Sequence, residues 1–387
     1  MTRGPSAARA PEAGGAVVPS ANSRSGARVP RAARLRPIAF AVLRRLEADR
    51  HTSGEQLARE LRVSRSTVWA GVRSLVGAGV EIDSGLGRGY RLRIPASWID
   101  PERVVASLGP AASGLRLQLA DHCPSTSTEL AGRADAGAVH GTVLLAEWQS
   151  AGRGRRGRAW TCPPGAGLTF SLLWRFDRPA RDLAGLSLAV GLAIAEAMRT
   201  LGLRDIALKW PNDVLHRGRK IAGVLVEVRG DMLGPTAAVI GIGLNVRVPT
   251  AALRAVGQPA TDLHRAGLAD PDRNAILAAL LSELATTLSR FERGGFAALR
   301  PQWQAHSAGH RQIVRVALPD GEVVRGCMLG VDEQGALRID TGESVRRIFS
   351  GDFDPRPPRA TGADGGIRQA ELDGAIAVPG DRAAPSE

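Results

Sequence analysis

The spacing of hydrophobic residues divides the chain into three stretches. From 36 to 95, hydrophobic residues recur at helical spacing and then give way to a glycine-rich segment with the pattern of a hairpin. From 96 to 306, apolar runs of strand length alternate with helical stretches, and from 307 to 354 short strand-like runs are separated by glycine-containing turns. The pattern predicts an α+β protein with a helical N-terminal domain, a central α/β domain and a small C-terminal β-barrel.

The first stretch predicts two short helices joined by a turn. Ser53 and Gln56 have the spacing of a capping box at the start of a helix that ends at Leu61. Ser64 is placed to cap a second helix, and a glycine-rich hairpin follows at 85–91. This order of elements is typical of a winged helix-turn-helix, whose second helix lies in the major groove of DNA.

Hydrogen-bond donors on the second helix and the hairpin are candidates for DNA contacts, because they can reach base edges and phosphates. Three-helix domains also serve as protein-docking domains, and the sequence favours DNA binding over that alternative. The candidate DNA-binding residues are Arg65, Ser66, Thr67, Trp69, Arg73 and Arg88.

Composition narrows the class of protein. Of the 387 residues 44% are hydrophobic, which excludes a wholly disordered chain. No apolar run reaches the roughly 18–20 residues that a membrane-spanning helix needs, so we expect no integral membrane protein. The three scattered cysteines predict neither a disulfide framework nor a metal site, and they are typical of a protein in the reducing cytoplasm.

Both ends of the chain have the composition of disordered tails. Residues 1–35 form a basic tail with a single acidic residue, Glu12, and residues 355–387 are rich in Pro, Gly and Ala. The N-terminal composition is also that of a mitochondrial transit peptide, but the helix-turn-helix pattern that follows favours a solvated tail.

An arginine- and glycine-rich segment at 152–158 lies between two strand-like runs. Its glycines let the backbone bend, and its four guanidinium groups offer forked donors to phosphate oxygens. A basic linker is the alternative interpretation, but the position inside a folded block favours a loop that closes over a nucleotide.

The basic residues are almost all arginine, and the only two lysines are Lys209 and Lys220. Lys220 begins an apolar run, so its ammonium group is expected on a rigid strand. There it can bind both a substrate carboxylate and an ATP phosphate and stabilise the transition state that leads to an acyl-adenylate. Asp213, between the two lysines, is placed to pair with a cation or with Mg²⁺. The sequence has no P-loop, Rossmann, zinc-protease or serine-hydrolase motif.

At these residues the sequence resembles the family of bifunctional biotin–protein ligases and biotin-operon repressors. The resemblance covers about residues 38–353 and is carried by GRGRRGRAW at 152–160, KWPND at 209–213, Lys220 and the glycine-rich run at 241–246. The helix-turn-helix run matches the repressor subclass rather than the subclass of ligases alone. The resemblance implies a winged helix-turn-helix domain at 36–95, a class II synthetase-like ligase domain at 96–306 and an SH3-like β-barrel at 307–354.

The resemblance also implies an activity. Such proteins join biotin and ATP, with Mg²⁺, into biotinyl-5′-AMP and pyrophosphate, and pass biotin to one lysine of the biotin carboxyl carrier protein of acetyl-CoA carboxylase. By position, Lys220 and Arg155 match catalytic residues, and Asp213 and Asn245 match positions near the nucleotide. No residue is assigned as a metal ligand. The implied biotin- and adenylate-binding residues are Ser125, Thr126, Ser127, Gln149, Gly152, Arg153, Gly154, Arg155, Lys220 and Gly223.

Two positions depart from the family pattern. Ser127 stands where the family usually has asparagine, so one hydrogen bond to the biotin ring is expected to differ. No tryptophan occurs at 259–263, where some family members pack an aromatic ring over the adenine.

The family resemblance implies a cytoplasmic homodimer that forms once the adenylate is bound and recognises a palindromic operator. Three alternatives remain open at this point. A lipoate ligase of the same fold is disfavoured by the arginine-rich segment and the helix-turn-helix. A transcription factor that only senses a small molecule has no need for phosphate-binding groups. A protein-interaction domain with a basic tail is the third.

Overall fold

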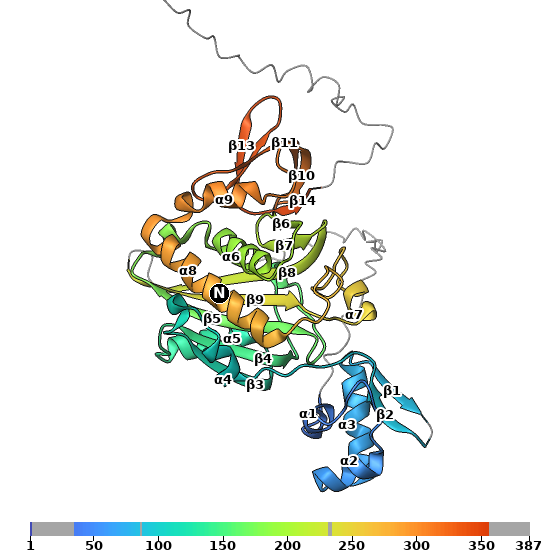
Figure 1. Ribbon diagram of the computed structural model, residues 1–387. Helices are drawn as coiled ribbons and strands as arrows, with labels where there is room; N and C mark the ends of the chain where they lie inside the picture. The colour runs from blue at the N-terminus through green and yellow to red at the C-terminus, as the bar shows by residue number, and fades with distance from the viewer. Residues whose placement is uncertain (2–34, 86, 231–233, 356–387) are drawn as a thin grey trace, which may run out of the picture.

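The computed structural model describes residue 1 and residues 35–85, 87–230 and 234–355. Figure 1 shows the N-terminal domain (blue) at one end of a large central sheet (green to yellow) and the C-terminal domain (orange to red) at the other end. The tails expected at 1–35 and 355–387 lie almost entirely outside the described residues.

The N-terminal domain is a helix-turn-helix followed by a hairpin. Its elements are α1 (Ile38–Leu43), α2 (Gly54–Leu61), α3 (Arg65–Gly77), β1 (Ile82–Gly85) and β2 (Gly89–Leu92). A hydrophobic cluster that includes Leu43, Leu57, Val68 and Leu75 fills the space between the helices. The predicted order of elements is confirmed.

Both helix starts follow from their capping serines. The Ser53 hydroxyl accepts a hydrogen bond from the Gln56 amide at 3.0 Å, and the Ser64 hydroxyl accepts one from the Thr67 amide at 3.1 Å. The Gln56 side chain donates to Glu60 at 2.9 Å, one turn further along α2. The cap predicted at Ser53 therefore forms, but the glutamine stabilises the helix surface instead of completing the box.

The central domain is built on a seven-stranded mixed sheet with the strand order β3-β4-β5-β9-β8-β7-β6. Only the β3–β4 pair is parallel among its strands. The strands are β3 (Arg116–Cys123), β4 (Thr142–Gln149), β5 (Gly167–Phe176), β6 (Ile206–Lys209), β7 (Asp213–His216), β8 (Arg219–Gly230) and β9 (Thr236–Asn245).

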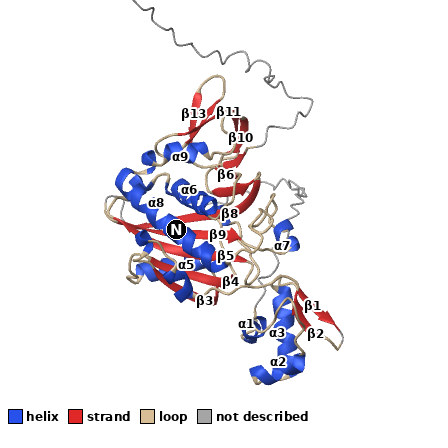
Figure 2. Cartoon of the chain, viewed as in Figure 1, coloured by secondary structure: helices blue, strands red, loops and turns tan. Residues whose placement is uncertain are grey.

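Helices cover both faces of this sheet (Figure 2). The long helices α6 (Leu186–Thr200) and α8 (Arg273–Gly294) pack on one face together with α4 (Pro101–Ala106), and α5 (Thr126–Asp135) packs on the other. Strand residues alternate between the two layers, as the two-residue period of a strand requires. The short helix α7 (Thr250–Arg254) follows β9.

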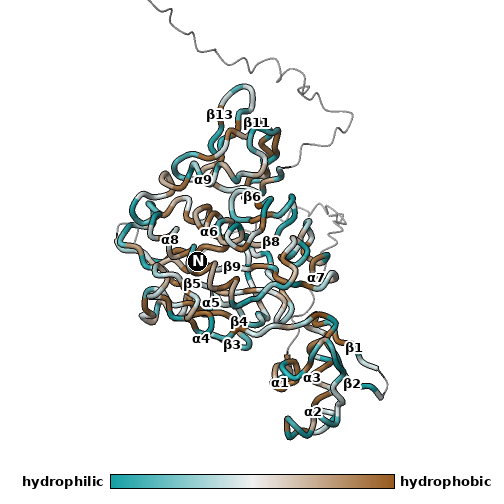
Figure 3. The backbone as a smooth tube through the Cα atoms, in the orientation of Figure 1, coloured by the Kyte–Doolittle hydropathy of each residue, from teal (hydrophilic) through white to brown (hydrophobic). Residues whose placement is uncertain are grey.

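The segment Ala180–Thr200, which ends in α6, is the one described helix that is long and apolar enough to cross a membrane. Two thirds of its apolar window is buried inside the protein, however, where it packs on α8 and the sheet. Figure 3 shows the hydrophobic colouring of α6 in the interior of the central domain. The burial is that of a core helix.

The C-terminal domain is a five-stranded antiparallel sheet with the order β13-β12-β11-β10-β14. Its elements, after α9 (Arg300–Ala305), are β10 (Ile313–Ala317), β11 (Val323–Val331), β12 (Leu337–Asp340), β13 (Val345–Ile348) and β14 (Asp352–Asp354). Its hydrophobic core is continuous with the core of the central domain. Trp210, 1% exposed, joins the two by donating a hydrogen bond from Nε1 to the Gly335 carbonyl at 3.0 Å.

The N-terminal domain keeps a separate core and meets the central domain at a seam. Arg44 of α1 forms an ion pair with Asp121 of β3, and its guanidinium lies 5.3 Å from the ring centroid of Trp98. The start of α8 fixes the connecting segment, because Arg273 donates to the Ser97 carbonyl at 2.6 Å and Asn274 to the Trp98 carbonyl at 3.1 Å.

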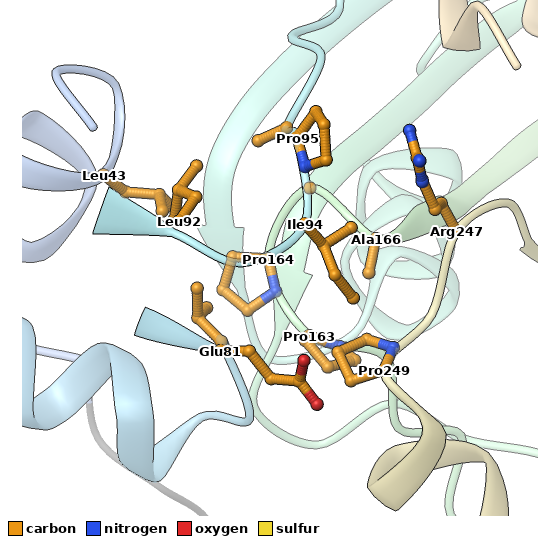
Figure 4. Close-up of a pocket in the computed structure, with 13 residues that line it drawn as sticks. Leu43, Glu81, Leu92, Ile94, Pro95, Pro163, Pro164, Ala166, Arg247 and Pro249 are labelled. Atoms are coloured by element: carbon orange, nitrogen blue, oxygen red, sulfur yellow. The ribbon is translucent and has the colours of Figure 1, made fainter. Parts of the chain in front are cut away.

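A buried ion pair lies beneath this connection. Arg273 and Glu147 are both less than 5% exposed and are 2.6 Å apart. A small cavity in the seam is drawn in Figure 4, where prolines of the central domain face hydrophobic residues of the winged helix. It is lined by Leu43, Val80, Glu81, Leu92, Arg247, Pro249 and residues 94–96 and 163–166.

The predicted fold class is confirmed: a winged helix-turn-helix, a central mixed α/β domain and a small C-terminal β domain. The boundaries at 36–95, 96–306 and 307–354 stay predictions.

Candidate active site

The candidate site lies on the face of the central sheet that carries α5, beyond the N-terminus of that helix. Val239 packs against α5, whereas the next residues of β9 on the same face are Gly241 and Gly243. Ser171 of β5 lies opposite Gly241, and its hydroxyl contacts Ser127 in the first turn of α5. Small residues thus form a floor on which other side chains pack closely: a Cβ atom at Gly241 would overlap the Ser127 hydroxyl oxygen.

Trp160 lies on this floor. A Cβ atom at Gly243 would overlap the indole ring, so this position requires glycine. A Cβ atom at Gly223 would lie 3.3 Å from the ring, which is a tight contact. The indole Nε1 is buried and has no hydrogen-bond partner among the described residues. A buried donor without a partner is costly, so an acceptor on a ligand would satisfy it.

Five polar residues form what we call the hydroxyl pocket: Ser125, Thr126, Ser127, Gln149 and Ser171. The Thr126 amide and hydroxyl both donate to Gln149 Oε1, at 2.7 and 3.1 Å. The Ser171 hydroxyl is 2.8 Å from that of Thr126 and 3.1 Å from that of Ser127. Each hydroxyl has one proton, and Thr126 uses its proton for Gln149. Ser171 therefore donates to Thr126, and Ser127 donates to Ser171. The Ser127 oxygen can then accept a hydrogen bond from a ligand.

Lys220 and Asp213 form a close ion pair beside Trp160. The Lys220 Nζ atom is 2.6 Å from Asp213 Oδ1, and their side chains are only 14% and 12% exposed. Lys220 is the second residue of β8, as the sequence predicts, and Asp213 begins β7. The ammonium group also lies 5.6 Å from the Trp160 ring centroid. Two strands and an aromatic ring therefore fix its position.

The arginine loop, residues 152–158, spans the connection between β4 and β5. The Gly154 amide donates to the Arg158 carbonyl at 2.7 Å, which folds the loop back on itself. Arg153 pairs with Glu227 of β8, and Arg155 donates to the Asn212 side chain at 3.3 Å. The loop therefore lies over the edge of the same floor, as expected for a segment that closes over a ligand.

Asn245 reaches the site indirectly. It is 6% exposed and donates from Nδ2 to the Thr261 carbonyl at 3.0 Å. The segment around Ala260 pairs with the backbone of Lys220, whose amide donates to the Pro259 carbonyl and whose carbonyl accepts from the Thr261 amide, both at 2.9 Å. Asn245 thus holds the segment 259–263 next to Lys220. This is the segment that lacks the tryptophan found in some family members.

Burial destabilises the charged forms of Arg155 and Lys209. It lowers the pKa of the Arg155 guanidinium, and repulsion from Arg156 lowers it further. Burial likewise lowers the pKa of Lys209, which Asp213 partly offsets. Partly desolvated cations without full compensation favour the arrival of an anionic ligand.

The arrangement combines a neutral acceptor, a buried cation and a cluster of guanidinium groups. It can bind a polar ring in the hydroxyl pocket, a carboxylate at Lys220 and phosphates near the arginine loop. Among the described residues, no group of three or more His, Cys, Asp or Glu side chains is arranged to hold a metal ion.

The structure brings most of the predicted site residues together. Three important residues were outside the prediction: Ser171, Asn212 and Trp160. Trp160 and Asn212 belong to the motifs 152–160 and 209–213, so the motifs contained a usable signal. Ser171 lies on a buried strand without a motif, and only its pairing with Gly241 reveals it.

Most candidate DNA-binding residues are exposed on the N-terminal domain. Arg65, Ser66 and Arg73 are exposed on α3, and Arg88 is exposed at the tip of the hairpin. Trp69 is 52% exposed, and the Arg73 guanidinium lies 4.9 Å from its ring centroid.

The hydroxyls at the start of α3 have partners within the helix cap. Those of Ser66 and Thr67 lie 2.7 and 2.8 Å from the Ser64 hydroxyl. They stabilise the helix start, so the exposed arginines and Trp69 are the stronger candidates for DNA contacts.

Comparison with known families agrees with this organisation. The model of the biotin/lipoate A/B protein ligase family matches residues 121–245, a helix-turn-helix domain matches residues 39–91, and the biotin protein ligase C-terminal domain matches residues 312–355.

Individual relatives extend over most of the chain. The bifunctional ligase/repressor BirA of Escherichia coli K12 is 33% identical over 304 residues, which cover 79% of this chain and 92% of that protein. The biotin–[acetyl-CoA-carboxylase] ligase of Mycobacterium tuberculosis is 39% identical over 68% of this chain and 96% of its own length. The structure of the Aquifex aeolicus biotin protein ligase with biotin and ATP is 28% identical, with a TM-score of 0.53 over 62% of this chain and 97% of that one.

Proposed function

Because this chain belongs to the biotin protein ligase family, we propose that it activates biotin with MgATP and transfers it to a protein. Biotinyl-5′-AMP and pyrophosphate form first, and biotin then passes to a lysine of the biotin carboxyl carrier protein of acetyl-CoA carboxylase. Mg²⁺ enters with ATP as part of the substrate.

The observation that carries the proposal is the Lys220–Asp213 pair. Activation needs the biotin carboxylate and the α-phosphate, both anionic, to approach each other. A buried ammonium fixed by a strand and by an ion pair at 2.6 Å can neutralise both while the new carboxyl–phosphate bond forms and pyrophosphate leaves. Asp213 keeps the ammonium in place.

The hydroxyl pocket supports biotin as the acid that is activated. The ureido ring of biotin carries two N–H donors and one carbonyl acceptor. The Ser127 oxygen can accept from an N–H group, and the Gln149 amide nitrogen can donate to the carbonyl. The Trp160 indole, which has no partner among the described residues, offers a further donor beside the floor.

The second step requires a closed but accessible site. The carrier lysine, as a free amine, attacks the acyl carbon of the mixed anhydride, AMP leaves, and an amide forms. The arginine loop would retain the adenylate and exclude water until the carrier arrives, because the anhydride is otherwise hydrolysed.

The test is incubation of the purified full chain with biotin, MgATP and a carrier domain, read by the intact mass of the carrier. We expect a single gain of one biotinyl group, and no gain when lipoate replaces biotin. Failure to modify a carrier that another biotin ligase modifies would contradict the proposal and favour a small-molecule sensor.

We further propose that the chain represses biotin biosynthesis genes by binding operator DNA as a cytoplasmic homodimer once the adenylate is bound. The exposed arginines on α3 and at the hairpin tip support phosphate and base contacts. An isologous dimer would place two such helices on the halves of a palindrome.

A duplex selected from a random-sequence library by the full chain, with biotin and MgATP present, would test this. Binding should weaken steeply as salt rises, because phosphate contacts release counterions. Arg65→Ala should weaken it by roughly tenfold, and Arg254→Ala on α7 should not. Sedimentation with and without the two substrates would report the dimer, and a monomer under both conditions would contradict that part.

A further inference from the structure

The arginine loop contains a strained residue at its tip. Arg156 has φ 55° and ψ 36°, the left-handed region that non-glycine residues seldom adopt. Such a backbone persists only where surrounding contacts hold it, and strained residues gather at sites where a segment must be held in one position. The contacts made by the Arg156 side chain therefore identify what holds the tip.

The C-terminal domain makes those contacts. Asp352 of β14 forms an ion pair with Arg156 at 3.2 Å and accepts a hydrogen bond from Arg158 at 2.7 Å. The Ser350 hydroxyl, just before β14, accepts from Arg156 at 3.3 Å. Residues almost 200 positions apart in the sequence thus meet over the site, and one carboxylate serves two guanidinium groups.

The other two arginines of the loop have partners inside the central domain. Arg153 pairs with Glu227, and Arg155 donates to Asn212. Arg153 and Arg155 therefore fix the loop to the central domain, whereas Arg156 and Arg158 fix it to the C-terminal domain. Loss of the C-terminal contacts would free Arg156 and Arg158 and leave the contacts of Arg153 and Arg155 in place.

The exposure of these contacts suits a latch that opens. The side chains of Arg156, Arg158 and Asp352 are 32%, 64% and 47% exposed. Ion pairs this exposed contribute little free energy, so they can break and re-form within a catalytic cycle. The loop must open to admit substrates and to let a carrier lysine reach the anhydride, and it must stay closed between the two events.

We propose that Asp352, assisted by Ser350, is a positioning residue that latches the tip of the arginine loop and so sets how long the acyl-adenylate is retained. The identity of the retained molecule rests on the proposed function, whereas the latching of the loop does not. Asp352 acts through Arg156 and Arg158 and touches no reacting atom.

The first experiment needs no activity. Hydrogen–deuterium exchange of the full chain without substrates, followed on peptides that cover 152–160, should be faster in Asp352→Asn than in the wild type. Glu343→Gln, which removes a carboxylate from an exposed position of the same domain, is the matched control and should change nothing. Equal exchange in Asp352→Asn and wild type, with equal melting temperatures, would overturn the latch.

The second experiment measures retention. Release of biotinyl-5′-AMP from the full chain should be about threefold to fivefold faster in Asp352→Asn, the range that exposed ion pairs support. Arg156→Ala should speed release similarly, and the double variant should show less than the summed effect, because both substitutions remove the Arg156–Asp352 contact. Asp352→Glu, which keeps the carboxylate, should restore most of the retention.

Two other outcomes are informative. If Asp352 instead shields the arginines from ATP, Asp352→Asn would lower KM for ATP and leave release unchanged, which would overturn the proposal. If the wild-type chain binds no adenylate, the proposed function fails, but the exchange experiment still decides whether the latch exists.

Discussion

The hydroxyl pocket and the arginine loop serve one site but are held in different ways. The pocket consists of neutral side chains, and its serine and threonine members are buried; the hydroxyls of Thr126, Ser127 and Ser171 form hydrogen bonds with one another. The loop consists of charged side chains, partly exposed, whose partners Glu227, Asn212 and Asp352 come from distant parts of the chain.

This difference separates recognition from retention. When one member of a buried hydrogen-bond network is removed, its partner is left unpaired at the full cost in desolvation free energy. Such a network therefore discriminates between ligands by geometry. Exposed ion pairs are individually weak and exchangeable, so they can hold a loop closed and still release it. Lys220 has features of both regions: its side chain is only 14% exposed, and it is charged like the loop.

Replacing Lys220 should have the largest effect. Lys220→Ala removes the buried cation that neutralises the carboxylate and phosphate, and adenylate formation should fall by at least about a hundredfold to a thousandfold. Pyrophosphate release measures this. Arg254→Ala, which removes an exposed arginine of α7, is the control and should change adenylate formation little. Unchanged turnover in Lys220→Ala would remove it from the mechanism.

Arg155→Gly should affect retention of the adenylate and leave recognition of biotin intact. It removes a charged donor that contacts Asn212, and release of the adenylate should become about tenfold faster. Affinity for biotin without ATP, measured by calorimetry, should stay nearly the same because the hydroxyl pocket is intact. An unaltered release half-life would count against the retaining role.

Ser171→Ala should weaken the affinity for biotin more than it shortens retention of the adenylate. It interrupts the donation from Ser127 to Thr126, so the affinity for biotin should weaken by roughly threefold to tenfold. The half-life of the bound adenylate should change less than in Arg155→Gly. Ser113→Ala, which removes an exposed hydroxyl far along the chain, provides the control. Equal effects of Ser171→Ala on affinity and retention would show that the two regions do not act separately.

The smallest expected effects concern the reactivity of two thiols, Cys123 near the hydroxyl pocket and Cys162 beyond the arginine loop. Burial raises the pKa of Cys123 to about 11 and that of Cys162 to about 12. Because alkylation needs the thiolate, both should react very slowly with iodoacetamide at pH 8, and Cys162 should still be protected at pH 9. Cys327, which is partly exposed, should react first. Mass mapping checks the order, and rapid labelling of Cys162 would show that the end of the arginine loop opens widely.

Sequence reasoning located local features better than distant partners. The caps at Ser53 and Ser64 and the strand position of Lys220 depend on neighbours a few residues away, and each could be predicted. The partnership of Ser171 with Ser127 depends on sheet register, and that of Asp352 with the arginine loop depends on how two domains pack. A single sequence contains no signal for such pairings when one partner, such as Ser171 or Asp352, belongs to no motif.

The division of the hydrophobic core determines where this chain could be cut. A break near residue 95 would leave the ligase core closed and lose one ion pair, one ring contact and the seam. A break near residue 306 would open a core that two domains share and would detach the tip of the arginine loop. The winged helix-turn-helix domain is thus a separate folding unit that such a protein can gain or lose, whereas the C-terminal sheet is part of the enzyme itself.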